Sequence, residues 1–268
     1  MADTWRFIDT GPRTAACNMA LDEAIAFTVR RDAAPPTLRI YGWNIPSVSM
    51  GYFQRTRDVD IGYCLENHIP VVRRPTGGRA ILHGNDMTYS FSVKTTSGLF
   101  SRGLFDSYEK ISAALCLALK KTGLSPELKL MREMKHPSPS SVHPRNPFCF
   151  ESISFGEVAV NGKKIVGSAQ KRWTDGLLQQ GSMPFLIDRD GITKIFRLNL
   201  HDTREPAICL NELSSDLNYS GLREAVRTSF EETFDHSLIV SSLSKEEISL
   251  AQELETQKYL SHEWTFRR

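Results

Sequence analysis

The chain has 268 residues, of which 40% are hydrophobic and 24% charged, a composition typical of a globular protein and not of a disordered or fibrous one. Its 33 basic and 31 acidic residues leave a formal net charge of +2, which gives no electrostatic basis for general binding to nucleic acids or membranes. No apolar run reaches the roughly 20 residues of a membrane span, and the N-terminal residues lack the pattern of a signal peptide. We therefore expect a cytoplasmic protein with neither a nucleic-acid nor a membrane partner.

The five cysteines are odd in number, widely spaced and free of any Cys-x-x-Cys pair. This pattern argues against a disulfide framework and against a zinc site, so no metal is predicted. Cys17 and Cys116 fall within helical apolar patterns, which favours packing roles for both. Cys149 instead follows a proline-rich segment, and its setting is considered separately below.

The first half of the chain is predicted to contain one long helix followed by short strands. Apolar residues at positions 21, 25 and 29 predict a helix over 14–31, which the two prolines at 35 and 36 end. Alternation and turn residues then predict strands at 37–41, 47–52, 69–73 and 87–93. The next element is a helix over 106–121 with Asp106 as its expected N-cap.

The second half begins with residues 134–149, which include four prolines and are expected to form a long irregular loop. Asn161-Gly162 predicts a type I′ turn that joins strands at 155–160 and 163–171 into a hairpin. A further strand is expected at 177–185, and helices at 222–234 and 244–259, the second with a capping box from Ser244 to Glu247. Strands and helices do not alternate regularly, which indicates the α+β class.

Three stretches contain residues suited to chemistry. The first, Arg73-Arg-Pro-Thr-Gly-Gly-Arg-Ala-Ile-Leu-His83, places two glycines after a strand, where the backbone can approach a ligand closely. It matches neither the phosphate-binding P-loop nor the dinucleotide fingerprint. Taken alone, its composition favours a hairpin turn bearing solvated arginines over a ligand site.

The second stretch is Asn161-Gly-Lys-Lys-Ile-Val-Gly-Ser-Ala-Gln-Lys-Arg172. Strand alternation predicts that Lys164, Val166 and Ser168 share one face, so that the lysine projects over small residues. The alternative is an exposed edge strand whose lysines discourage aggregation.

The third stretch places Cys149 between two phenylalanines at the end of the proline-rich segment. A thiol is nucleophilic as the thiolate, which a nearby cation favours. Residues 129–172 contain eight basic and three acidic side chains, a local charge of +5, so such a cation is available. A buried, unreactive loop cysteine is the alternative.

Together, RRPTGGRAILH and NGKKIVGSAQKR resemble the biotin/lipoate protein ligase and transferase superfamily, and DTGPRTAACNMALDEAI and LRIYGWNIPSVSMGYFQ fit it as well. The resemblance covers about residues 5–190. It implies an α+β catalytic domain of mixed sheets with flanking helices, related in shape to class II synthetases. We expect one such domain over 1–268, with a core at about 5–190 and a helical C-terminal extension at about 191–268.

Within the superfamily, the Thr-Gly-Gly-Arg sequence at 76–79 and the Cys-Phe-Glu context at 149–151 are similar to the cysteine-dependent octanoyltransferases. The resemblance implies that Cys149 accepts the acyl group and that Lys164, fifteen residues later, activates it. Asp86 departs from the family, which tends to carry a longer acidic side chain there. The implied substrate-binding residues are Arg73, Thr76, Gly77, Gly78, Arg79, His83, Gly167, Ser168 and Ala169.

The resemblance implies transfer of an octanoyl group from acyl carrier protein to a lipoyl-domain lysine, for example of glycine cleavage H protein, through a cysteine thioester. No ATP, metal or other cofactor is expected, and a monomer is expected. The alternatives are an ATP-dependent lipoate ligase, an amidotransferase that moves octanoyl between lipoyl domains, and a non-catalytic protein that binds a lipoyl or biotinyl group.

Overall fold

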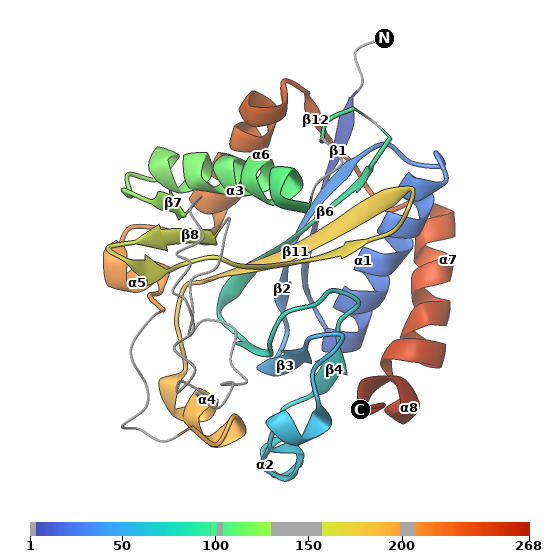
Figure 1. Cartoon of the computed structure of the whole chain (residues 1–268), viewed down its shortest axis with the longest axis vertical. Coiled ribbons are helices and arrows are strands. Elements are labelled where there is room, and N and C mark those ends of the chain that lie inside the picture. The colour runs from blue at the N-terminus through green and yellow to red at the C-terminus, as the bar shows by residue number, and fades with distance from the viewer. Residues whose placement is uncertain (1–3, 97, 101–103, 130–156, 199–206) are drawn as a thin grey trace, which may run out of the picture.

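A six-stranded mixed sheet with helices on both faces forms the centre of the computed structural model, which describes residues 4–96, 98–100, 104–129, 157–198 and 207–268 (Figure 1). Its strand order is β10 (Gly167–Arg172), β11 (Gly176–Pro184), β6 (Asp86–Lys94), β2 (Thr37–Trp43), β1 (Trp5–Arg13) and β12 (Leu238–Val240). Strand β1 is parallel to β2 and β12, and the remaining neighbours are antiparallel.

Two pairs of helices cover the sheet. Helices α1 (Ala15–Arg30) and α7 (Lys245–Leu254) lie on one face, and α3 (Leu104–Lys121) and α6 (Tyr219–Phe234) on the other (Figure 1). Strand β2 shows how alternation builds both layers. Leu38 and Ile40 join the core under α3 and α6, whereas Tyr41 and Trp43 join the core under α1 and α7.

Smaller elements surround this centre. One three-stranded sheet has the order β4 (Val71–Arg73), β3 (Ser47–Met50) and β5 (Ile81–His83), and another has β7 (Glu127–Lys129), β8 (Glu157–Val160) and β9 (Lys163–Lys164). The short helical segments are η1 (Thr56–Asp58), α2 (Ile61–Glu66), α4 (Arg189–Ile195), α5 (Leu210–Leu213), η3 (Glu255–Tyr259) and α8 (His262–Thr265). In the part of the chain that the structure describes, no helix is long and apolar enough to cross a membrane.

The α+β class and the four predicted helices are confirmed, with changes at their ends. The capping box of Ser244 and Glu247 is present at the start of α7. Helix α3 begins at Leu104, so Asp106 lies in its first turn and is not its N-cap. The predicted helix over 244–259 changes at Glu255, where η3 continues it with π-helical hydrogen bonding.

The predicted hairpin is correct at its turn and wrong in its second strand. Asn161 and Gly162 have φ values of 52° and 72°, as a type I′ turn requires. Lys163–Lys164 pair with β8, but Gly167–Arg172 leave that sheet and pair with β11. The residues from Lys164 to Gly167 are all buried, because this crossing between two sheets is covered on both sides. The predicted alternation of faces therefore fails here.

A buried carboxylate joins the helix layer to the sheet. Asp22 of α1 accepts hydrogen bonds from Arg39 Nη1 at 2.6 Å, Tyr41 OH at 2.8 Å, Ser90 Oγ at 2.6 Å and Gln180 Nε2 at 2.6 Å. The side chains of Asp22 and Arg39 are both 0% exposed. A buried ion pair is tolerated when further hydrogen bonds satisfy it, and removal of one partner leaves an uncompensated charge.

We therefore predict that Asp22→Ala lowers the free energy of unfolding by about 3–5 kcal/mol, measured by urea denaturation. Asp190→Ala is the matched control, because the Asp190 side chain is 79% exposed and pairs with Lys194 at the surface. That substitution should change the stability by less than about 1 kcal/mol. Equal losses in the two variants would contradict this account of the core.

Candidate functional site

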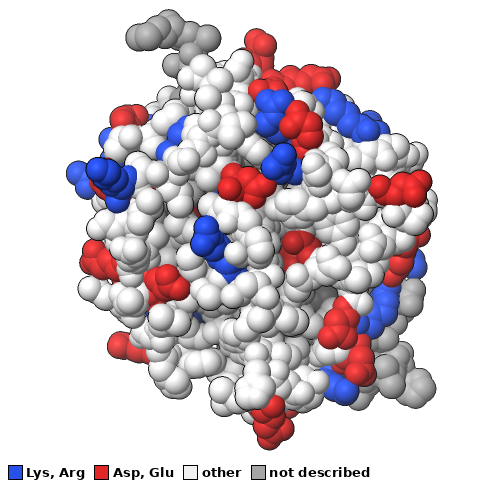
Figure 2. Space-filling model, turned by 180° about the vertical axis from the view of Figure 1, so that it is seen from behind, with Lys and Arg blue, Asp and Glu red and all other residues white. Residues whose placement is uncertain are grey.

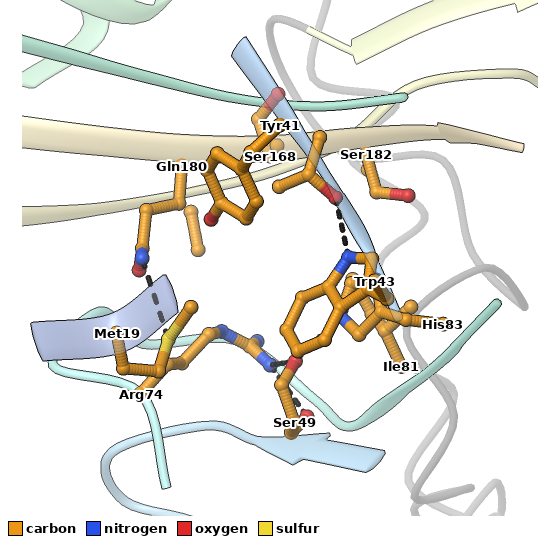
Figure 3. A pocket seen from close by; sticks show the side chains of 14 residues that line it. Met19, Tyr41, Trp43, Ser49, Arg74, Ile81, His83, Ser168, Gln180 and Ser182 are labelled. Carbon is orange, nitrogen blue, oxygen red and sulfur yellow. Dashed lines mark hydrogen bonds between the residues drawn. The ribbon is translucent and has the colours of Figure 1, made fainter. Parts of the chain in front are cut away.

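A pocket lies between the large sheet and the sheet of β3, β4 and β5, and it receives side chains from both (Figure 3). Met19, Tyr41, Trp43 and Ile81 give it apolar walls, and Arg74 and the hydroxyl groups of serines add polar atoms. The full lining comprises Met19, Tyr41, Trp43, Ser49, Arg74, Ile81, His83, Thr88, Gly167, Ser168, Ala169, Gln180, Gly181 and Ser182.

The free space inside the pocket is small. The cavity volume is about 20 Å³, which is room for about one water molecule. A ligand with a longer apolar chain must therefore displace lining side chains. Met19 is suited to such movement, because its unbranched thioether repacks readily.

Arg74 connects the turn at Gly77 and Gly78, called the glycine turn below, to strand β3 through hydrogen bonds. Its Nη1 donates to the backbone oxygen of Ser49 at 2.8 Å, and its Nη2 donates to the backbone oxygens of Gly77 at 2.7 Å and Arg79 at 2.6 Å. Gly78 has a φ of +82°, a conformation that favours glycine. The turn is thus held in one position beside the pocket.

Arg73 and Thr76 of the first motif contact protein groups. The Arg73 guanidinium donates to the backbone oxygens of Gly51 at 2.8 Å and Thr265 at 2.9 Å. Burial lowers the pKa of Arg73 to about 10, assisted by the charges of Arg267 and other neighbouring arginines. Thr76 Oγ1 donates to the side chain of Gln180 at 2.8 Å. Of the residues from Arg73 to Arg79, only Arg74 is among those that line the pocket. Contacts with substrate remain a prediction for Arg73, Thr76, Gly77, Gly78 and Arg79.

His83 does line the pocket, and its ring is held on three sides. It stacks on Trp43 with ring centroids 3.9 Å apart and an interplanar angle of 14°. Its Nδ1 lies 2.9 Å from Asp86 Oδ2, and its Nε2 lies 2.8 Å from Ser49 Oγ. Burial would raise the pKa of Asp86, but the electrostatic interaction and hydrogen bond with His83 and the hydrogen bond from Ser182 outweigh burial and hold that pKa below its usual range.

The second motif reaches the pocket through Gly167, Ser168 and Ala169, all of which line it. Ser168 Oγ lies 2.9 Å from Tyr89 OH, which also accepts a hydrogen bond from Gln179. Burial raises the pKa of Tyr89 to about 12, so this phenol stays protonated. Gly167, Ser168 and Ala169 therefore line the same pocket as His83.

Lys164 lies outside the pocket lining, three residues before Gly167. Its side chain is only 1% exposed and forms an ion pair with Glu157 of β8. An ammonium group at such depth needs an anionic partner, which Glu157 provides. Cys149 lies outside the described residues, so its pairing with Lys164 stays a prediction.

Several pocket residues were not predicted, among them Met19, Tyr41, Trp43, Arg74 and Gln180. Tyr41 and Trp43 had a signal, since residues two apart on a strand share a face. The sequence contains no signal that Arg74 lines the pocket, because which of two adjacent arginines faces a pocket depends on the direction of the backbone. Within the described ranges, no group of three or more His, Cys, Asp or Glu residues is placed to hold a metal ion.

Comparison with known proteins places these features in a family. Residues 14–231 match the model of the lipoyl protein ligase A/B catalytic domain. The chain is 36% identical to octanoyltransferase LipM of Carboxydothermus hydrogenoformans and 33% identical to that of Bacillus subtilis, in each case over 99% of both chains. The crystal structure of lipoate-protein ligase A bound with ATP shares the fold, with a TM-score of 0.81 at 23% identity over 99% of both chains.

The close backbone contact beside the glycine turn generates a prediction. A Cβ at Gly51 would lie 1.9 Å from the carbonyl oxygen of Gly78, whereas a Cβ at Gly77 would meet nothing within 4 Å. Gly51→Ala should therefore displace the turn and lower the free energy of unfolding by about 1–3 kcal/mol. Gly77→Ala should change it by no more than about 0.5 kcal/mol in the same denaturation experiment. Similar values for the two variants would show that the turn adapts freely.

Proposed function

The chain belongs to the lipoyl protein ligase A/B catalytic domain family, and we propose that it is the acyltransferase that moves an octanoyl group in protein lipoylation. The observation that carries this proposal is the similarity over 99% of both chains to proteins named octanoyltransferase LipM. We further propose that the donor is octanoyl-acyl carrier protein and the acceptor a lipoyl-domain lysine, as in glycine cleavage H protein. The setting is the cytoplasm, and the enzyme acts as a monomer.

The chemistry requires no ATP, because the donor is already an activated thioester. The Cys149 thiolate attacks the octanoyl carbonyl, and the carrier thiol leaves with the proton that Cys149 gave up. The acceptor lysine amine then attacks the new thioester, forms the amide and transfers its proton to the departing Cys149 thiolate. Two thioesters of similar energy are exchanged in the first step, and the more stable amide is formed in the second.

Lys164 supports the anionic states of this cycle. Its ammonium group is held in the protein interior by the ion pair with Glu157. A cation in such a low-dielectric place stabilises a nearby thiolate more strongly than a solvated lysine would. Glu157 thus acts as the positioning residue for the charge that Cys149 requires.

The apolar walls of the pocket suit an octanoyl chain once Met19 and other lining side chains move to admit it. Burial is worth roughly 0.8 kcal/mol per CH2, so a chain of this length gains several kcal/mol from apolar walls. Gly167 pairs with Ser182 and Ala169 with Gln180 along the β10–β11 ladder. Gly167 is the pocket residue of β10 nearest in sequence to Lys164. The octanoyl carbonyl group therefore lies at the Gly167 end, and the octanoyl tail points toward Ala169 and Gln180.

Two related activities share this fold. An ATP-dependent lipoate ligase needs nucleotide and no cysteine nucleophile, and an amidotransferase takes octanoyl from another lipoyl domain. The full-length similarity to named octanoyltransferases supports octanoyl transfer over ATP-dependent ligation, and the choice of carrier protein as donor is part of the proposal. Each alternative predicts a different donor, so one experiment separates the three.

We predict that incubation with octanoyl-acyl carrier protein, without ATP, adds about 126 Da to the intact protein. The adduct should be removed by hydroxylamine and should be absent in Cys149→Ala. Lys164→Ala should form it at least about 100-fold more slowly, because the thiolate loses its neighbouring charge.

Acceptor modification only with lipoate and ATP would identify a ligase. An adduct formed only from an octanoylated lipoyl domain would identify an amidotransferase.

A basic rim beside the glycine turn supports docking of an acidic carrier protein. We use this name for Lys171, Arg267 and Arg268. The cationic groups of Lys171 and Arg267 lie 4.9 Å and 3.9 Å from the centre of the Tyr52 ring, and that of Arg268 lies 5.3 Å from the centre of the Phe53 ring. Phe53 is 66% exposed, and it gives this rim an apolar contact point. Figure 2 shows the face of the molecule opposite to that in Figure 1, where basic and acidic side chains are interspersed among uncharged ones.

We predict that Lys171→Glu combined with Arg268→Glu raises the KM for octanoyl-acyl carrier protein by about tenfold at low salt, because the rim then repels an acidic partner. The effect should shrink as salt screens the charges. Lys245→Glu is the control, since Lys245 is exposed at the end of α7 remote from α8 (Figure 1). The control reverses one charge and the double variant two, so a rise in KM of about threefold in the control would assign the effect to net charge alone.

A further inference from the structure

Three side chains follow the hydrogen-bonding order of a serine-hydrolase relay: Ser49 and His83 line the pocket, and Asp86 contacts His83 from outside the lining. Ser49 Oγ lies 2.8 Å from His83 Nε2, and His83 Nδ1 lies 2.9 Å from Asp86 Oδ2. His83 and Asp86 are three residues apart where β5 leads into β6, whereas Ser49 lies on β3 and is brought to His83 by the pairing of β3 with β5. Such a constellation is recognised by geometry and roles, whatever the order of its members along the chain.

The hydrogen-bond partners determine where the protons lie. Asp86 also accepts from Thr88 Oγ1 at 2.8 Å and Ser182 Oγ at 2.7 Å, so its carboxylate acts as an acceptor throughout. His83 Nδ1 therefore carries the proton that faces Asp86, and Nε2 is left to accept the proton of Ser49. Neutral imidazole with this tautomer is the state that a general base requires.

The serine oxygen also contacts a cation. Arg74 Nη1 lies 3.2 Å from Ser49 Oγ and donates to it, so negative charge that develops on this oxygen is stabilised. The hydroxyl thus has a base on one side and a fixed positive charge on the other. Both features lower the barrier to attack by an otherwise weak nucleophile.

The relay is held rigidly and faces the pocket. Trp43 stacks on the His83 ring, and its own indole nitrogen is fixed by a hydrogen bond of 2.8 Å to Thr88. Ser49 and His83 both line the pocket, and Figure 3 shows the Ser49 side chain directed inward beside Arg74. Ser47 lies two residues away on the same strand, but its hydroxyl donates to the backbone oxygen of Ile45 at 2.9 Å.

We propose that Ser49 is a second acyl-accepting nucleophile, with His83 as its base, and that the protein hydrolyses medium-chain acyl esters without using Cys149. Ser49 Oγ bonds to the acyl carbonyl carbon while its proton passes to His83 Nε2. The ester bond breaks, and the leaving alcohol takes that proton from His83. Water then attacks the acyl-serine, gives one proton to His83, and releases the carboxylic acid as the Ser49 hydroxyl re-forms.

The choice of an eight-carbon acyl group rests on the proposed function, but the activity itself does not. Hydrolysis by Ser49 would proceed in a protein that lacks the cysteine nucleophile. Failure of octanoyl transfer and failure of this proposal are therefore observed separately.

The test uses the full-length Cys149→Ala protein and two probes, p-nitrophenyl octanoate and an alkyl fluorophosphonate. We expect release of p-nitrophenol, and we expect phosphonylation that peptide mass spectrometry places on Ser49. Ser49→Ala should abolish the label and slow hydrolysis roughly 100-fold or more. His83→Gln and Asp86→Asn should reduce both signals, because they remove the base or its tautomer.

Ser47→Ala is the matched control, and it should retain both the label at Ser49 and the hydrolysis. Absence of a label on Ser49 in the folded Cys149→Ala protein would overturn the proposal without any further substitution. Hydrolysis that is lost in His83→Gln but unchanged in Ser49→Ala would also overturn it, since His83 would then activate water directly. Thermal melting of each variant identifies any loss that arises from unfolding.

Discussion

The Asp22 carboxylate is the point on which the core and the pocket both depend. It lies on α1, yet the four hydrogen bonds it accepts come from side chains of three strands. One of these, from Gln180, continues through Thr76 to the glycine turn. The position of the turn is thus connected to a buried ion pair in the centre of the molecule. A buried charge with incomplete partners is strongly unfavourable, so this network permits one arrangement of helix and sheet.

A second constraint is the close approach of two backbone segments at Gly51 and Gly78. No side chain at position 51 fits beneath the Gly78 carbonyl group, and this lets the turn lie directly against β3. The adjacent arginines then act on opposite sides. Arg74 reaches into the pocket, whereas Arg73 donates to the backbone oxygen of Thr265 in the last helical turn of the chain. The C-terminal residues therefore brace the loop that borders the pocket.

Two buried side-chain pairs of different kinds lie at the pocket and at β9, which precedes the pocket-lining residues of β10. Lys164 and Glu157 form a buried ion pair, in which the carboxylate offsets the cost of burying the ammonium group. His83 and Asp86 form a pair in which the imidazole keeps a free nitrogen for a neighbouring hydroxyl, Ser49. The first keeps an ammonium group in the protein interior, and the second places an imidazole nitrogen beside a hydroxyl group. The two pairs are linked along the chain, because Lys164 ends β9 and the next strand, β10, begins at Gly167, which lines the pocket together with His83.

Local patterns in the sequence predict the α+β class, the four long helices, the Asn161-Gly162 turn and the family to which the chain belongs. These features depend on local periodicity, on turn chemistry or on motif identity, all of which are read directly from neighbouring residues. The pocket-lining roles of His83, Gly167, Ser168 and Ala169 were also accessible, because they lie within those motifs. Tertiary structure alone decided that β12, near the end of the chain, pairs with β1 at its start, because such pairing depends on packing between distant segments. It likewise decided that the strand after the turn divides between two sheets, that Arg74 and not Arg73 lines the pocket, and that Ser49 meets His83, since each contact joins segments whose separation in sequence carries no information about their distance in space.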